Sequence, residues 1–138
     1  DSSTTLTIPS TASLVITVAA YNALTFSYAD FSGRGPTQIY EGENANKPDL
    51  AAPGVRVMAP VAGGGYAEFT GTSFAFVTGS AALLMEWGIV KGNDPYLYGE
   101  KVKAYLRRGA RQIPGYERWP NGKLGYGRLC IVQSIPGM

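Results

Sequence analysis

Hydrophobic residues form their first long run at residues 13–20, SLVITVAA. Its β-branched residues and polar flanks are typical of a strand covered on both faces, inside a parallel or mixed sheet. Aromatic residues, glycines and asparagines then alternate over residues 21–46, which predicts a loop-rich stretch with exposed turns. Residues 47–57 contain a short apolar strand, a Pro-Gly turn at 53–54 and the start of another strand.

Three consecutive glycines, Gly63 to Gly65, punctuate the next apolar pattern. They predict a hairpin turn that joins residues 57–61 to residues 66–70. Glycine runs of this kind usually serve backbone geometry, and we do not interpret this one as a phosphate-binding loop.

Two helices are expected in the second half of the chain. A mostly apolar run of helical length begins at Thr72 and ends at Gly88, which suits the C′ position, and it predicts a buried helix. Asp94 followed by Pro95 is typical of a helix start, and the second helix should run through about Arg108. Its inward residues are expected to be Val102, Tyr105 and Leu106, and Gly109 should end it. After two further turns, the segment LCIVQSI predicts a short final strand or helical turn.

Composition supports one globular domain over residues 1–138, with no second domain. The chain has 18 glycines in 138 residues, and 45% of its residues are hydrophobic, which is ample for a core. The fraction of charged residues, 16%, lies below the usual value of about 25%. These values favour a well-buried α/β or β-rich fold.

The chain contains no histidine and one cysteine, Cys130. It therefore cannot build a Ser-His-Asp or Cys-His couple, or a histidine-ligated zinc site, from its own residues. One cysteine forms no internal disulfide, and we interpret Cys130 as a small buried hydrophobic residue. Acidic residues are scattered, so no calcium-binding loop and no other metal site is identified.

Charge is distributed unevenly. Residues 1–90 carry three basic and seven acidic side chains, whereas residues 91–138 carry nine and three. A basic tail can indicate an anionic partner, but five of these cations are also expected on the solvated side of one helix: Lys101, Lys103, Arg107, Arg108 and Arg111. No nucleic-acid motif is present, and no uninterrupted apolar run approaches the length of a membrane span.

The segment with the clearest chemical potential covers residues 66–73. A strand leads into Gly71 and then into two hydroxyl residues, Thr72 and Ser73, at the mouth of the predicted apolar helix. Unpaired backbone N–H groups at such a mouth favour negative charge and would stabilise an oxyanion while the serine acts as nucleophile. Spacing alone favours the simpler interpretation, a helix cap by Ser73 or Thr72.

The identities of the residues around Ser73, in addition to their spacing, distinguish these two interpretations. GTSFA at residues 71–75, followed by VTGSAALL at 77–84, resembles the serine motif of the subtilisin-like serine proteases. KPDLAAPGV at 47–55 and FSGRGP at 31–36 are similar to segments of the same family. Ile8-Pro9, before the first apolar run, is similar to a family proline that is often cis. The tail resembles the clostridial branch, which includes the spore-germination proteases.

The resemblance implies a doubly wound, mainly parallel α/β fold whose buried helix begins at the serine motif. It implies that Ser73 is the nucleophile and that its backbone N–H donates to the oxyanion. Thr72, Gly71, Ala75 and Pro9 would contact or position a peptide or protein substrate. In the family the order along the chain is Asp, His, oxyanion Asn and Ser, so the first three members would precede residue 1. The chain is then the C-terminal part of a serine endopeptidase domain and should be inactive alone.

One departure from the family pattern follows Ala75. A small residue and a proline normally separate this alanine from the next apolar pair, but here Phe76 follows directly. Losing two residues turns everything downstream by about 200°, so the helix either begins later or repacks its core face. A catalytically dead regulatory domain on the same scaffold is therefore an alternative. An unrelated binding module, whose basic helix at 95–108 meets an anionic surface, is a second.

Several further expectations concern partners and location. An isolated half-domain should expose sheet edges, so the chain should need its N-terminal half, dimerise or exchange elements with a second copy. By resemblance, calcium binding and a secreted, cell-envelope or spore-associated location are expectations without a supporting motif. Neither nucleic acid nor membrane is expected as a partner.

Overall fold

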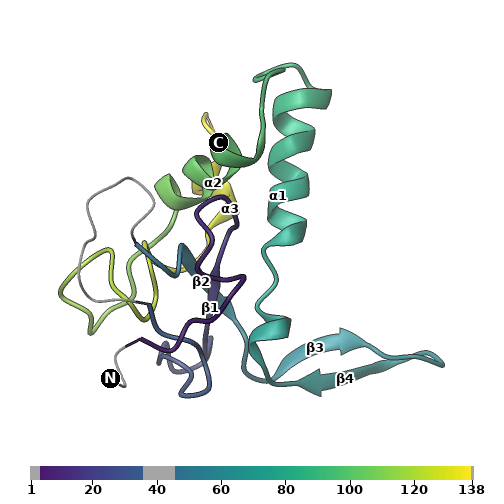
Figure 1. Cartoon of the computed structure of the whole chain (residues 1–138). Helices are drawn as coiled ribbons and strands as arrows, with labels where there is room; N and C mark the ends of the chain where they lie inside the picture. The colour runs from purple at the N-terminus through teal and green to yellow at the C-terminus, as the bar shows by residue number, and fades with distance from the viewer. Residues whose placement is uncertain (1–3, 36–45, 138) are drawn as a thin grey trace.

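Two short parallel strands form the centre of the molecule (Figure 1). The computed structural model describes residues 4–35 and 46–137. In chain order its elements are β1 (Val18–Tyr21), β2 (Leu50–Pro53), β3 (Val57–Pro60), β4 (Tyr66–Phe69), η1 (Thr72–Phe74), α1 (Thr78–Met85), η2 (Glu86–Val90), α2 (Gly99–Arg108) and α3 (Ile131–Ser134).

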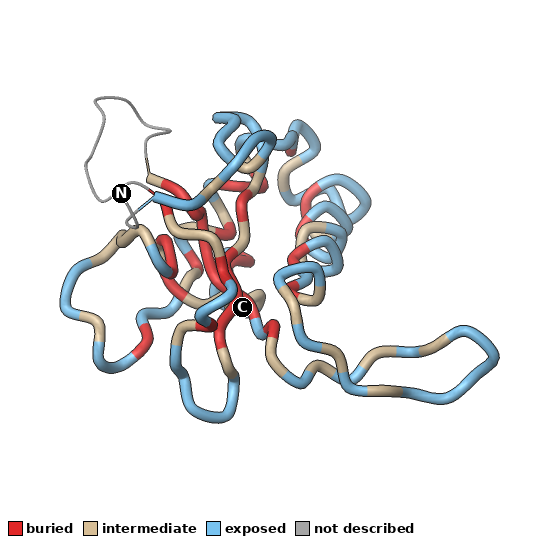
Figure 2. The backbone as a smooth tube through the Cα atoms, turned by 60° about the horizontal axis from the view of Figure 1, so that its bottom comes forward, coloured by how far each residue is buried: buried red, intermediate tan, exposed pale blue. Residues whose placement is uncertain are grey.

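Alternate residues of the two parallel strands point into two separate cores, as the period of two requires. Ala20, Leu50 and Ala52 pack with helix residues that include Leu84 and Leu106. The second core lies on the other face of the strands. It consists of five buried residues, of which the last two come from loops: Ala19, Tyr21, Ala51, Ile113 and Leu124. The prediction of a strand covered on both faces is confirmed, and Figure 2 shows these strands as the most buried part of the chain.

β1 is shorter than the predicted strand because residues 13–17 form turns and irregular backbone. Ser13 and Val15 accept hydrogen bonds from lysine ammonium groups through their carbonyl oxygens instead of joining a ladder. Leu14 and Val15 are exposed. The predicted loop-rich stretch 21–46 has turns and isolated bridges where it is described, and its residues 36–45, with Pro36 of the FSGRGP segment, lie outside the described residues.

The predicted hairpin is confirmed: β3 pairs antiparallel with β4. Gly63, Gly64 and Gly65 all have φ near 90°, a backbone region that favours glycine. The hairpin projects from the rest of the molecule (Figure 1) and is exposed or half-buried along its length (Figure 2).

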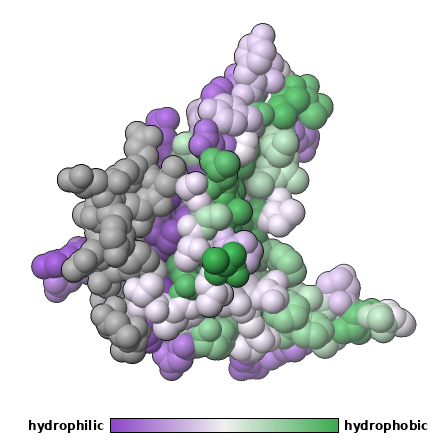
Figure 3. Space-filling model, in the orientation of Figure 1, coloured by the Kyte–Doolittle hydropathy of each residue, from purple (hydrophilic) through white to green (hydrophobic). Residues whose placement is uncertain are grey.

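The predicted buried helix at the serine motif is wrong in its start, its end and its burial. α1 begins at Thr78, and Leu84 is its one buried residue. Helical structure continues through Gly88, which is buried against Leu97, and ends before Gly92, whose φ is 72°. The later start is one of the two outcomes expected from the two missing residues. The exposed apolar surface is visible along α1 in Figure 3.

Residues 72–90 together are long and apolar enough to cross a membrane by length and composition, although 22% of this stretch is buried. The prediction that rested on uninterrupted apolar runs did not identify this longer segment, because it includes polar residues. Its helix is interrupted between Phe74 and Thr78, where the backbone of Ala75 is not helical. Core helices of soluble proteins pass the same test, so the finding is weak evidence for a membrane.

α2 ends as predicted at Arg108, with Gly109 as its cap, but it begins at Gly99 rather than at Pro95. The carboxylate of Asp94 accepts hydrogen bonds from Lys101 Nζ and Tyr105 Oη instead of capping a helix. The hydrogen bond from Lys101 holds the pKa of Asp94 below its ordinary value. Asp94 therefore ties the preceding loop to the side of α2.

A buried ionic cluster surrounds Asp49, which is fully buried. Its carboxylate pairs with Lys47, Lys103 and Arg107. Lys103 is only 4% exposed, so the prediction that it and Arg107 lie on a solvated helix face is wrong. Burial lowers the pKa of Lys103, with a further lowering by Lys47 and Arg107. The cluster joins α2 to the approaches of both parallel strands.

The end of the chain is the helical turn α3, one of the two predicted alternatives. Cys130 immediately precedes it and is half-buried rather than buried. Val102 and Leu106 of α2 are buried as predicted, and Tyr105 is half-buried against the same core.

Candidate nucleophile and peptide-binding groove

Backbone hydrogen bonds tie the serine segment to the parallel sheet. Gly54, just beyond β2, donates to the carbonyl oxygen of Tyr21 at the end of β1 (3.0 Å), and its own carbonyl accepts from Gly71 N–H (2.9 Å). A Cβ on Gly54 would lie 2.6 Å from the Cβ of Ala20, so only glycine fits here without movement. The turn that holds Ser73 is thus placed beyond the carboxyl ends of the strands, where open α/β sheets bind ligands.

Ser73 lies at the middle of η1 and is exposed. The turn is closed by hydrogen bonds from Phe74 N–H to Gly71 and from Ala75 N–H to Thr72. Within the described residues, the hydroxyl and the backbone N–H of Ser73 have no hydrogen-bond partner. An exposed hydroxyl beside an available N–H matches the requirements for a nucleophile and for one oxyanion donor.

Three phenylalanines flank the serine. The rings of Phe69 and Phe74 stack with centroids 4.7 Å apart, and Phe76 meets Phe74 edge-on at 6.3 Å. Phe76 is 62% exposed. These contacts hold the serine turn against the base of the hairpin.

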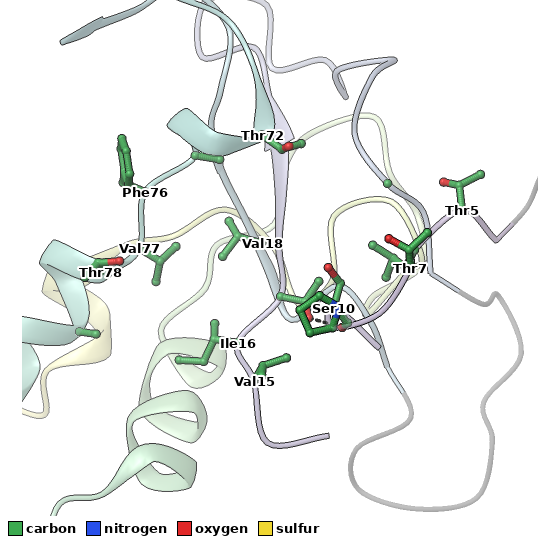
Figure 4. A pocket seen from close by; sticks show the side chains of 16 residues that line it. Thr5, Thr7, Ser10, Val15, Ile16, Val18, Thr72, Phe76, Val77 and Thr78 are labelled. Carbon is green, nitrogen blue, oxygen red and sulfur yellow. Dashed lines mark hydrogen bonds between the residues drawn. The ribbon is translucent and has the colours of Figure 1, made fainter. Parts of the chain in front are cut away.

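A mostly apolar groove of about 610 Å³ begins beside this turn. Figure 4 shows Thr72 at one end of it and Val18, Ile16 and Val77 along its walls. Pro9 also lines it, and the Ile8–Pro9 peptide is cis as predicted. Three of the five predicted site residues, Thr72, Ala75 and Pro9, therefore line one cavity, while Ser73 and Gly71 lie in the adjoining turn.

One wall of the groove is the outer edge of β1. Backbone groups of Thr17 and Tyr21 face β2, because Thr17 accepts from Asp49 N–H and Tyr21 accepts from Gly54 N–H. By alternation, the backbone groups of Ile16 and Val18 face the opposite edge. They have no partner on that edge among the described residues, whereas the outer edge of β2 is already bonded to residues 127–129.

Residues 75–77 separate the serine turn from α1. Ala75 has φ −80° and ψ 67°, and Ala75 and Val77 are buried while Phe76 between them is exposed. The dipole of α1 therefore begins at Thr78 and does not point from Ser73 itself. This link occupies the position where the family pattern has two more residues.

No described group of three or more His, Cys, Asp or Glu residues is arranged to hold a metal ion. The chain has no histidine at any position. The described residues therefore offer Ser73 no histidine as a general base.

The Subtilase family profile matches residues 1–127. The chain belongs to the subtilase family. This subtilase resembles the CspB protease of Clostridium perfringens, with 45% identity and a TM-score of 0.86 over 94% of the chain. That similarity confirms the predicted clostridial branch. The prenylagaramide maturation protease PagA is 27% identical with a TM-score of 0.73 over 96% of the chain. Fervidolysin from Fervidobacterium pennivorans, 24% identical over 95% of the chain with a TM-score of 0.69, shares the fold.

The subtilase chain spans 27% of CspB, 47% of PagA and 20% of fervidolysin. It therefore corresponds to less than half the length of each of these proteins. Comparison with curated protein sequences finds no match.

Sequence reasoning found the serine turn but missed two features that shape the site. The free edge of β1 depends on which strand lies on which side, which a single sequence does not reveal. The Asp49 cluster had a sequence signal, since Lys47 and Asp49 flank a proline just before a buried strand. Two alternating charges beside an apolar strand were candidates for burial as a pair.

Proposed function

We propose that this subtilase chain is the nucleophile-bearing C-terminal part of a serine endopeptidase domain. Ser73 would attack a peptide carbonyl, its proton would pass to a histidine, and the tetrahedral intermediate would collapse to an acyl-enzyme that water hydrolyses. The observation that carries the proposal is the exposed Ser73 hydroxyl beside its own available N–H, on a turn bonded to the ends of two parallel strands.

The histidine, the aspartate and a second oxyanion donor would come from polypeptide outside residues 1–138. Removing a triad member typically lowers the rate by about 10⁴-fold or more, so we expect the chain alone to be inactive. Support comes from the length comparison, because CspB is matched over 94% of this chain but only 27% of its own.

The missing segment would pair with the outer edge of β1 and cover the apolar side of α1. The unbonded edge at Ile16 and Val18 and the exposure of Leu83, Ile89 and Val90 support this placement. An exposed parallel strand edge beside an apolar groove is costly in water and invites pairing. If the segment is lacking, we expect a homodimer or an assembly with exchanged elements.

Within this proposal a peptide substrate would lie along the groove that Thr72 and Pro9 line. Gly71 would keep the strand-to-turn corner close to the substrate, because its N–H is held by Gly54. Ala75 is buried below the turn and also lines the groove, so it would position Ser73 at the border of the substrate. No cofactor is part of the proposal.

A catalytically dead regulatory domain is the second candidate, and the link at residues 75–77 favours it. Since α1 begins five residues beyond Ser73, the serine N–H lacks the support of a continuous helix. The groove and the apolar surfaces would then serve binding alone.

Labelling with a fluorophosphonate probe in the complete polypeptide separates the two candidates. Robust labelling that Ser73→Ala abolishes supports the endopeptidase, whereas no labelling in a well-folded protein supports the dead domain. A matched variant with Thr-Pro inserted between Ala75 and Phe76 tests the cause. If the insertion restores labelling, the shortened link is responsible for inactivity.

A further inference from the structure

Three cations that have no carboxylate partner among the described residues line one pocket. Six of the twelve lysines and arginines form ion pairs, namely Lys47, Arg56, Lys91, Lys101, Lys103 and Arg107. The other six form none with a described carboxylate: Arg34, Arg108, Arg111, Arg118, Lys123 and Arg128. Three of these six, Arg34, Arg118 and Lys123, line a single pocket of about 430 Å³.

The pocket carries a surplus of positive charge. Among the described residues, Glu117 is the one acidic residue on its wall, and none of the ion pairs found there joins it to the three cations. Arg34 and Lys123 both lie over the ring of Tyr28, at 5.3 Å and 5.9 Å from its centroid. Like charges near one ring repel each other, and an anion between them would remove that repulsion.

Hydrogen bonds position the three cationic residues before any ligand arrives. Asn121 donates through Nδ2 to the carbonyl of Arg118 and accepts through Oδ1 from Lys123 N–H. Gly35 N–H donates to the carbonyl of Gly122 at 2.8 Å, so the strand of chain that holds Arg34 is tied to the same turn. Arg34 is itself held by Thr5, whose N–H donates to the Arg34 carbonyl and whose hydroxyl accepts from Arg34 N–H.

We propose that this pocket, formed by Arg34, Arg118 and Lys123, binds the carboxylates of an acidic peptide segment. Two guanidinium groups suit the planar, two-oxygen geometry of carboxylates, and the ammonium group adds a third donor. The cations converge on one concave site rather than following a stripe along the surface, which favours a short acidic segment over a nucleic-acid backbone. The site shares no lining residue with the groove at Thr72, so it is independent of the role of Ser73.

This location differs from the anionic surface expected from sequence. On α2 and beside it, Lys101 pairs with Asp94, and Lys103 and Arg107 pair with Asp49. Arg108, at the end of α2, also lacks a described carboxylate partner, but the three cations that share a pocket lie on the loop at residues 115–123 and on the segment that carries Arg34.

Fluorescence anisotropy with a labelled hexaglutamate peptide tests the proposal in the complete polypeptide. A double variant, Arg34→Gln with Arg118→Gln, should weaken binding by at least about tenfold because two charge-assisted contacts are lost. The matched control, Arg108→Gln with Arg111→Gln, removes two unpaired cations outside the pocket and should change the affinity less than about twofold. Binding should also weaken as salt rises from about 50 to about 300 mM.

Four results would overturn the proposal. They are no binding of hexaglutamate by the folded protein, equal binding of hexaglutamine, equal losses in the two double variants, and tighter binding of a single-stranded oligonucleotide than of hexaglutamate. Circular dichroism of each variant checks folding, and because all four substituted side chains are outside both cores, the variants should remain folded.

Discussion

The region around Asp49 and the region around α1 each hold groups in surroundings that are costly for them, but of opposite kinds. Around Asp49 a charged carboxylate is buried, whereas along α1 apolar side chains are exposed. Asp49 is fully buried, yet three cations and the N–H of Thr17 contact its carboxylate. α1 has an apolar sequence, yet Leu84 is its one buried residue. One region has completed its contacts within residues 46–107 and the N-terminal segment, whereas the other presents surfaces that have no complement among the described residues.

The difference shows that the described residues complete the contacts of the Asp49 region but not those of the α1 region. Buried charges are tolerated because each is paired, and the cluster links α2 to both parallel strands. Around α1, the unbonded backbone groups of Ile16 and Val18 and the exposed side chains of Leu83 and Val90 are the usual features of an interface. The nucleophile candidate lies between the two regions and depends on both.

The largest effect is expected from removing the charge at the centre of the cluster. Asp49→Asn leaves Lys47, Lys103 and Arg107 without their counter-charge, and it should lower the free energy of unfolding by about 3–5 kcal/mol. Urea unfolding followed by tryptophan fluorescence measures this change. Asp30→Asn is the control, because this exposed carboxylate makes no ion pair with a described residue, and it should shift stability by less than about 0.5 kcal/mol. Similar losses in both variants would contradict the assignment.

A leucine pair on α1 tests the other region. Leu84→Ala removes a fully buried side chain and should cost about 2–5 kcal/mol, whereas Leu83→Ala, at a side chain 51% exposed, should cost little. The same two variants are then compared in the complete polypeptide. If α1 is covered by a further segment, Leu83→Ala becomes destabilising there. A Leu83 that remains neutral in that context would argue against a covered face.

A glycine pair tests the connection between the regions. A Cβ at Gly54 would lie 2.6 Å from Ala20 Cβ and 3.0 Å from the Gly71 carbonyl oxygen, so Gly54→Ala should cost about 1–3 kcal/mol and shift the serine turn. Fluorophosphonate labelling of Ser73 should fall with it. Gly79→Ala meets no atom within 4 Å and should stabilise α1 by up to about 1 kcal/mol. Unchanged labelling in Gly54→Ala would separate the serine turn from the sheet.

The smallest expected effect is the dependence of stability on pH that Asp94 produces. Because the hydrogen bond from Lys101 lowers the pKa of Asp94, the ionised carboxylate stabilises the fold. This contribution is fully present above the usual aspartate value of about 3.9 and is lost as pH falls through the lowered value. Asp94→Asn should therefore lower the urea midpoint slightly at pH 7, and the difference from wild type should vanish in stronger acid. A difference that grows in acid would reverse the sign of the argument.

The first strand and the hairpin were predictable because their signals are local. The β-branched run before Tyr21 and the three glycines at 63–65 specify a strand and a turn without reference to distant residues. The residues of the motif around Ser73 indicated the family, and the match to the family profile then established it.

Helix boundaries were harder because distant contacts decided them. Asp94 has the features of a helix cap, but Lys101 and Tyr105 bind its carboxylate, and α2 begins later. The burial of Lys103 was not predictable from a basic helix, since it depends on Asp49, which lies 54 positions earlier and beside β2. The pattern of α1 predicted burial, but among the described residues Leu84 is the one side chain of α1 that is buried.

The hydrogen bond between Gly54 and Gly71 has a consequence for protein engineering. It joins the two ends of the β3–β4 excursion, and a second bond from Arg56 N–H to the Thr70 hydroxyl reinforces the closure. A loop whose ends are already joined can be lengthened, shortened or replaced with little effect on the scaffold that carries it. The tip at Gly63 to Gly65 is therefore a suitable insertion point for an affinity tag or a reporter peptide, in a protein whose serine turn would keep its place.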